Sequence, residues 1–261
     1  MGLDEFLYHQ NEILVVAILF GLLLVATEVG FRRGRVIRGG LEDPAKSELT
    51  TLQGAMVGLL ALLLAFSFAM AESRFETRRE LVLEEANAIG TTYLRSQTLA
   101  EPYQTKVATL LREYVVNRLK YYAAGIDPKK VDEVKKQTDQ LQKELWSEAM
   151  DAINKDPHSI PAGLFISSLN EVIDLHLKRD IARKNHVPEA VLLLLFLVAI
   201  LATSIVGFGC GMGGWRALSV TVTMSLIITL VILAIMDLDR PRNGFIKVSQ
   251  QSMIDLQDSI K

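Results

Sequence analysis

The chain has 261 residues, of which half are hydrophobic and 22% are charged, a balance that suits a protein divided between lipid and water. Its formal net charge of −2 excludes the broad basic field of a nucleic-acid-binding protein. The single cysteine, Cys210, excludes an internal disulfide and metal binding through CxxC pairs, and the histidines form no HExxH or HxH pattern.

The first apolar run covers residues 13–29, and we expect a retained transmembrane helix there because no basic segment or cleavage site marks a secretory signal. Glu28 near its end has two interpretations. It is either an intramembrane carboxylate that handles ions or protons, or half of an interfacial i,i+4 ion pair with Arg32. Residues 30–51 then form a short basic connection, in which glycines and Pro44 are expected to break any long helix.

The second apolar run, residues 52–70, carries no charge and is long enough to cross the roughly 30 Å hydrocarbon core of a bilayer. It continues without proline into a charged segment that keeps helical spacing, with Phe75, Val82 and Ile89 on one stripe. The pattern predicts one long helix that spans the membrane and extends into water, with the other segments packed around it.

Two strips of residues follow this second helix. One strip is small, which lets another helix backbone approach closely, and consists of Gly54, Gly58, Ala61, Ala65 and Ala69. The other is bulky and consists of Leu59, Leu62, Leu63, Phe66 and Met70. The bulky strip either lines a hydrophobic constriction that gates by dewetting, or faces lipid or a neighbouring helix.

Residues 71–189 are expected to form a water-soluble helical domain, with helices near 71–99, 102–124, 128–154 and 161–185. Glu101-Pro102 and Asp127-Pro128 each match an N-cap followed by proline at the first helical position. No alternating β-branched run predicts a sheet. We expect this domain to lack a large core of its own and to pack against the extended second helix and other copies of the chain.

Two further membrane helices are predicted at 190–208 and 218–236. Gly209, Gly211 and Gly214 between them match GxGxxG, but no strand precedes them, so we interpret this segment as a tight turn rather than a dinucleotide loop. In the fourth helix a line of hydroxyls either solvates an ion or bonds to carbonyls of its own helix and its neighbours; it consists of Thr221, Ser225 and Thr229.

Residues 237–261 are expected to be a polar tail that begins with a charge cluster, namely Asp237, Asp239, Arg240 and Arg242. These side chains form either an ion-pair clamp at the membrane exit or part of a Ca²⁺ site, although sequence supplies few of the necessary oxygens. In 168–180, Glu171 and Asp174 share a helix face that His176 does not join, so a metal site is disfavoured. No catalytic arrangement or phosphate loop is present, and we predict a non-enzyme without metal or cofactor.

Four spans place both termini and the soluble domain on one side of the membrane. The first helix has basic residues only after it, which argues that the loop following it is inside the cell. Counting the Lys and Arg residues that flank all spans favours a cytoplasmic domain instead, and we adopt that orientation, in a bacterial inner membrane.

Several segments together resemble a bacterial family of integral membrane proteins described as bestrophin-like: LLLAFSFAM with RFETRR, EANAIGTTYLR, SLNEVIDLH with NHVP, and DLDRPRNGFIKVSQ. This resemblance covers nearly the whole chain. Residues 58–82 also resemble the second-helix signature of the bestrophin anion channels. The predicted fold is thus an all-α, bestrophin-like polytopic membrane protein with four transmembrane helices and a helical domain between the second and third.

The resemblance implies a homo-oligomer, a pentamer around a central anion pore, whose neck falls at Leu59, Leu62, Phe66 and Met70. Its vestibule would carry Arg74, Glu76, Arg78 and Arg79. Its partners would be the bilayer, other copies of itself and small inorganic ions. Three departures stand against conduction or calcium gating: Ser67 and Phe68 replace a polar pair, Arg74 and Glu76 are one residue closer than in the family, and no acidic loop follows Met236.

Two alternatives remain at this stage. One is a non-conducting membrane scaffold or accessory protein that uses the helical domain for docking. The other is a proton-driven stator subunit, which the absence of carboxylates from the third and fourth spans before Asp237 disfavours.

Overall fold

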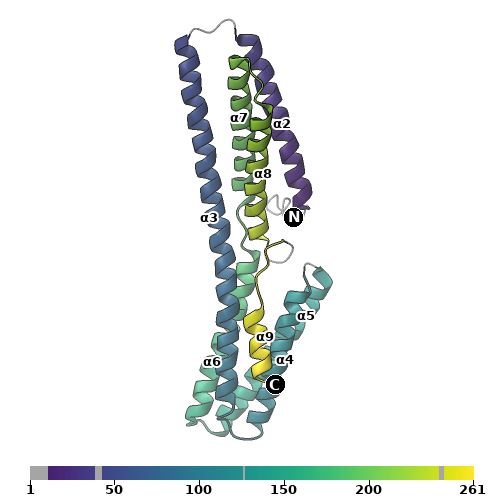
Figure 1. Ribbon diagram of the computed structural model, residues 1–261. Helices are drawn as coiled ribbons and strands as arrows, with labels where there is room; N and C mark the ends of the chain where they lie inside the picture. The colour runs from purple at the N-terminus through teal and green to yellow at the C-terminus, as the bar shows by residue number, and fades with distance from the viewer. Residues whose placement is uncertain (1–10, 39–42, 126, 241–243) are drawn as a thin grey trace. The chain divides into compact units, whose positions relative to one another are not determined.

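The computed structural model describes residues 11–38, 43–125, 127–240 and 244–261. Within these ranges the chain is helical and contains no strand, as the sequence predicts. The helices are α2 (Glu12–Ile37), α3 (Asp43–Ser96), α4 (Tyr103–Ala123), α5 (Pro128–Lys155), α6 (Ile160–Lys184), α7 (Glu189–Gly213), α8 (Leu218–Asp239) and α9 (Gln251–Ser259) (Figure 1).

The helices belong to two compact units. Unit 1 comprises Met1–Ser73 and His186–Arg240, and unit 2 comprises Arg74–Asn185 and Pro241–Lys261. Helix α3 contributes its first part to unit 1 and its second part to unit 2. Four stretches of the described chain are long and apolar enough to cross a membrane: Glu12–Ile37, Ser47–Ser96, Ile160–Gly213 and Leu218–Asp239. The four-span, all-helical prediction is therefore confirmed.

In unit 1, α2 packs along α7 at very short range because both helices carry glycines at the contact. A Cβ atom added at Gly30 would overlap the carbonyl oxygen of Ser204, and one added at Gly207 would overlap the carbonyl oxygen of Thr27. Gly34 and Gly211 meet the opposite helix backbone in the same way. In lipid no hydrophobic effect drives helices together, so the van der Waals contacts made at this close approach stabilise the pair of helices.

These glycines correct two predictions. Residues 30–37 were expected to belong to a connection, but α2 continues through them because Gly30 and Gly34 serve the contact with α7. Gly209 and Gly211 were expected in a tight turn, yet both are helical. Only Gly214, with φ of 74°, ends the helix in the left-handed conformation that glycine permits.

In unit 2, predicted helix starts are confirmed at one site and corrected at another. Asp127 caps α5 through its side chain, which accepts from the backbone N–H of Lys129 at 3.1 Å, and Pro128 occupies the first helical position. At α4 the cap is Pro102 rather than Glu101, and it makes no side-chain capping bond. At α6 the hydroxyl of Ser159 accepts from the N–H of Ala162.

Unit 2 has a continuous hydrophobic core, contrary to the expectation that it would lack one. Tyr114, Phe165 and Leu145 are fully buried, together with Ile89 from α3. The predicted packing against the extended second helix is thus correct, but the core is larger because the chain's end joins it. In place of a polar tail, α9 inserts Met253 and its neighbours into this core.

Candidate functional site

The predicted neck residues lie on a side of α3 that the rest of the chain leaves uncovered. The exposed fraction is 50% for Leu59, 51% for Leu62 and 63% for Phe66, and Met70 is exposed as well. Apolar side chains that are bare in one chain of a membrane protein face either lipid or another protein copy.

The other side of the same segment packs inward. Leu60, Ser67 and Ala71 are buried, and their spacing of seven and four residues places them on one face of the helix. The first part of α3 therefore has a definite inner side and a definite outer side.

The small-residue strip is also on the outer side. Gly54, Gly58, Ala61 and Ala65 are exposed, and among the described residues no atom beyond the adjoining turns of the helix lies within 4 Å of a Cβ built at either glycine. Within one chain the close contacts between helix backbones use the glycines of α2 and α7 instead. The strip on α3 remains open for a second molecule.

The charged residues that follow the second span have separate surroundings. Glu76 and Arg79 form an exposed ion pair at 2.8 Å, and Arg74 is half-buried. Arg78 is buried, and its guanidinium donates to the carbonyl oxygens of Ala182 and Asn185 at 3.1 and 2.7 Å. Because those carbonyls belong to the last turn of α6 and its cap, Arg78 satisfies a helix C-terminus.

The charge cluster after the fourth span is buried rather than spread over a surface. Asp239 accepts from the backbone N–H of Val187 at 2.7 Å, and its backbone carbonyl lies 3.0 Å from Nδ1 of His186. Arg240 lies 3.8 Å from Glu12, and Asp237 is also buried. Arg242, predicted to join this cluster, lies outside the described residues.

Glu28 and two of the three hydroxyls of the fourth span follow the simpler of the two interpretations offered for them, whereas the buried hydroxyl of Ser225 has no hydrogen-bond partner among the described residues. Glu28 pairs with Arg32 at 2.7 Å and with Arg216 at the same distance. Thr221 and Thr229 donate to carbonyls of their own helix. Ser225 is buried between them.

A buried ionic cluster in unit 2 was not predicted from the sequence. Glu85 is completely buried and forms ion pairs with Arg118, at 2.8 Å, and with Arg179. Burial alone would raise the pKa of Glu85, but the two guanidiniums outweigh it, so this pKa lies below its usual value. A signal was present: Glu85 follows Val82 by three residues and Arg118 follows Val115 by three, at core-facing positions.

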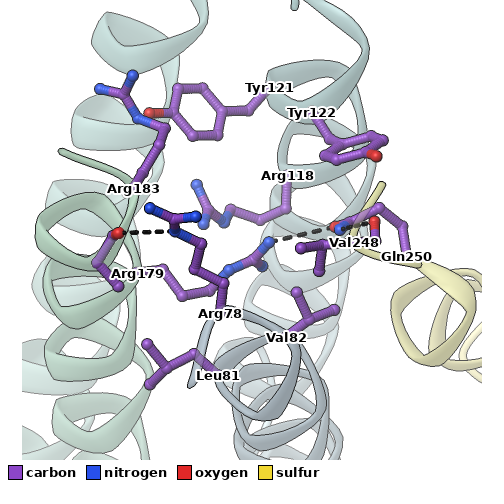
Figure 2. Close-up of a pocket in the computed structure, with 11 residues that line it drawn as sticks. Arg78, Leu81, Val82, Arg118, Tyr121, Tyr122, Arg179, Arg183, Val248 and Gln250 are labelled. Carbon is purple, nitrogen blue, oxygen red and sulfur yellow. Dashed lines mark hydrogen bonds between the residues drawn. The ribbon is translucent and has the colours of Figure 1, made fainter. Parts of the chain in front are cut away.

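A small pocket adjoins this cluster. Figure 2 shows the guanidiniums of Arg78, Arg118 and Arg179 pointing toward one another from α3, α4 and α6. The remaining wall comes from Arg183, apolar side chains, two tyrosines and Gln250, and the volume is about 50 Å³. Gln250 accepts from Arg179 at 3.2 Å.

Two titratable groups lie near this cluster. Burial, and then the positive charge of Arg118, lower the pKa of His176 to about 4. Asp180 lies at the edge of the cluster and accepts from the hydroxyl of Tyr121 at 2.8 Å, and Lys135 is 3.1 Å away. Among the residues that the structure describes, no group of three His, Cys, Asp or Glu side chains is placed to hold a metal ion.

The comparisons with known proteins agree with this arrangement of spans and helical domain. A family model described as a bestrophin-like domain matches residues 20–253. The chain belongs to the bestrophin-like family. The predicted family is therefore confirmed, and no match was found among curated proteins.

Solved structures of bacterial bestrophin homologues share the fold of this bestrophin-like chain. One single-site variant from Klebsiella pneumoniae is 14% identical with a TM-score of 0.70, and the match covers 97% of this chain and 96% of that one. Another variant is 16% identical with a TM-score of 0.66, covering 94% and 97%. A third structure from the same organism is 16% identical with a TM-score of 0.63, covering 96% of both chains.

Proposed function

We propose that this bestrophin-like protein is a homo-oligomeric ion channel, a pentamer that conducts small anions through a pore lined by α3. The family supports a channel, and the resemblance of residues 58–82 to the bestrophin second helix supports five subunits and an anion. We place the protein in the bacterial inner membrane with residues 71–189 in the cytoplasm, residues 1–70 and 190–236 forming the membrane part, and the charged segment 237–261 on the cytoplasmic side.

The arrangement of α3 carries this proposal. Its inner side, at Leu60 and Ser67, is already packed, so only the outer side is available to other copies. When Gly54 and Gly58 of one copy meet the next copy, the adjoining strip at Leu59, Leu62 and Phe66 turns toward a shared axis. A ring of such side chains is a hydrophobic constriction that opens and closes to ions by wetting.

A flux measurement tests the proposed neck. Protein reconstituted in liposomes is compared with the double variant Leu62→Ala/Phe66→Ala, and truncation is expected to widen the constriction and raise chloride flux. The matched control is Leu193→Ala/Leu197→Ala on α7, because these leucines have the same spacing and exposed fractions of 55% and 53%. Equal changes in chloride flux in both variants would show that Leu62 and Phe66 do not line the ion pathway.

The same experiment separates the channel from a non-conducting scaffold that docks partners on its helical domain. A scaffold would show no flux in the wild-type protein at any pH or Ca²⁺ concentration. Its α3 variant would then differ from wild type only in stability, which thermal unfolding of the same preparations measures.

A further inference from the structure

We propose that the arginine-lined pocket of unit 2 binds one small inorganic anion, of the size and charge of a halide, as a fixed constituent of the helical domain. The site is defined by Arg78, Arg118, Arg179 and Gln250. It lies apart from the outer strips of α3 and does not depend on conduction.

The charges of the side chains around the pocket favour an anion. Arg118 and Arg179 both pair with the single carboxylate of Glu85, so the three groups together carry one excess positive charge. Arg118 is 2% exposed, and Arg78, 6% exposed, brings a third guanidinium to the same wall. Arg183, the fourth arginine of the lining, pairs with Asp180. An unbalanced charge held out of water is costly, and a bound anion removes that cost.

A hydrogen-bond donor of Arg118 also favours an anion. Arg118 lines the pocket, yet its Nη1 atom is buried and has no hydrogen-bond partner among the described residues. A buried N–H of a guanidinium without an acceptor costs more than an ordinary lost hydrogen bond. An anion held against the Arg118 guanidinium would supply that acceptor.

The size of the pocket and its apolar surroundings suit a small ion. A volume of about 50 Å³ is sufficient for one small ion. Leu81, Val82 and Val248 form much of the wall. These apolar neighbours lower the local dielectric and strengthen the attraction between the guanidiniums and an anion.

The electrostatics of the arginines agree. Burial, together with the nearby charge of Arg118, leaves the pKa of Arg179 below its usual value despite the presence of Glu85. For Arg118 the charge of Glu85 outweighs burial and holds the pKa above its usual value, so Arg179 is the guanidinium that a further negative charge would stabilise.

The test is thermal unfolding of the full-length detergent-solubilised protein in sodium bromide, sodium chloride or sodium gluconate at equal ionic strength, so that general screening is the same in each. We expect bromide and chloride to raise Tm by a few degrees in a saturable manner, because an ion that binds only the folded state stabilises it. We expect gluconate, which is much larger than a halide, to leave Tm unchanged. Equal Tm values in the three salts would overturn the proposal.

Two variants locate the effect. Arg179→Gln leaves Glu85 and Arg118 balanced, and Gln250→Glu places a carboxylate where the anion would neutralise Arg179, so the halide-dependent rise should vanish in both. Arg112→Gln is the control, because Arg112 is an exposed arginine in the same unit that donates to the carbonyl of Ile260 and lies outside the pocket. A rise that persists in Arg179→Gln and Gln250→Glu would place the ion elsewhere.

Diffraction decides the matter directly, even where a variant fails to fold. Crystals of the wild-type protein grown in bromide should show an anomalous peak within hydrogen-bonding distance of Arg118 Nη1. Water density without anomalous signal at that position would refute the site.

Discussion

At the scale of single residues, Glu85 determines whether the buried arginines of unit 2 are tolerated. It is the carboxylate that both Arg118 and Arg179 contact, and it is completely out of solvent. A buried ion pair adds little net stability when intact, but removing one partner strands the other charge without water or a counterion.

We therefore expect Glu85→Gln to lower the free energy of unfolding by about 3–5 kcal/mol. The measurement is thermal unfolding at pH 7 in a fixed salt. Glu84→Gln is the control, since Glu84 is the neighbouring carboxylate on an exposed face and should change Tm little. A similar loss in both variants would mean that general charge, not the buried pair, is responsible.

His176 gives the helical domain a pH dependence of known sign. Its pKa falls from 6.5 to about 4 on folding, so between these values the unfolded chain binds a proton that the folded chain does not. Above pH 6.5 His176 is neutral in both the folded and the unfolded state and does not reduce the free energy of unfolding. As the pH falls from 6.5 toward 4, the proton that binds only to the unfolded state lowers this free energy.

Replacing His176 with glutamine should flatten the dependence of Tm on pH between 6.5 and 4. His158→Gln, which alters an exposed histidine, should retain the wild-type slope. Burial opposes the charge of Asp180, but Tyr121 and the surrounding lysines stabilise it, so the pKa of Asp180 lies below its usual 3.8. The contribution of Asp180 to the free energy of unfolding is therefore lost only at lower pH. Identical slopes for wild type and the His176 variant would contradict this assignment.

At the scale of secondary-structure elements, the sequence predicts where the helices are better than where they meet. The uncharged run 52–70 and the Asp127-Pro128 cap locate helices because chain-local forces decide them. Gly30 and Gly211 were assigned to connections because glycine weakens a helix locally, and only the position of the opposite helix reveals their role.

The buried cluster was missed for a related reason. A charged residue at a core-facing position is ambiguous until its partners are known, and Glu85 is separated in sequence from Arg118 by 33 residues and from Arg179 by 94. The exposure of the two α3 strips could not be predicted from the sequence either, because it depends on which side of α3 the rest of the chain covers.

The contact between α2 and α7 yields a direct prediction. Gly207→Ala places a methyl group against the carbonyl of Thr27, so the helices must separate, at a cost of about 1–3 kcal/mol. Gly21→Ala on α2 meets nothing within 4 Å and should leave Tm unchanged or slightly higher, because alanine favours a helix. Thermal unfolding in detergent compares the two, and equal Tm values would show that α2 and α7 tolerate a wider separation.

At the scale of the whole molecule, the open side of α3 is the feature that one chain does not account for. A helix with Gly54 and Gly58 on its outer side loses packing energy if only lipid chains cover it, since mobile acyl chains fill such a groove poorly. We expect a second copy of the protein to cover this groove, as the proposed ring requires.

If this contact assembles the protein, Gly58→Leu should break the oligomer by filling the groove. Light scattering with correction for bound detergent measures the protein mass, and we expect five chains for wild type and a smaller species for the variant. Gly21→Leu adds the same side chain to a glycine of α2 that is equally unobstructed within the chain, and should keep the wild-type mass. Because the bulky strip adjoins the small one, a variant that loses the ring also loses the proposed pore, so chloride flux should fall with the mass. A Gly58→Leu protein that retains the full mass would remove the small-residue strip from the subunit interface, and with it the argument that Leu62 and Phe66 face an axis.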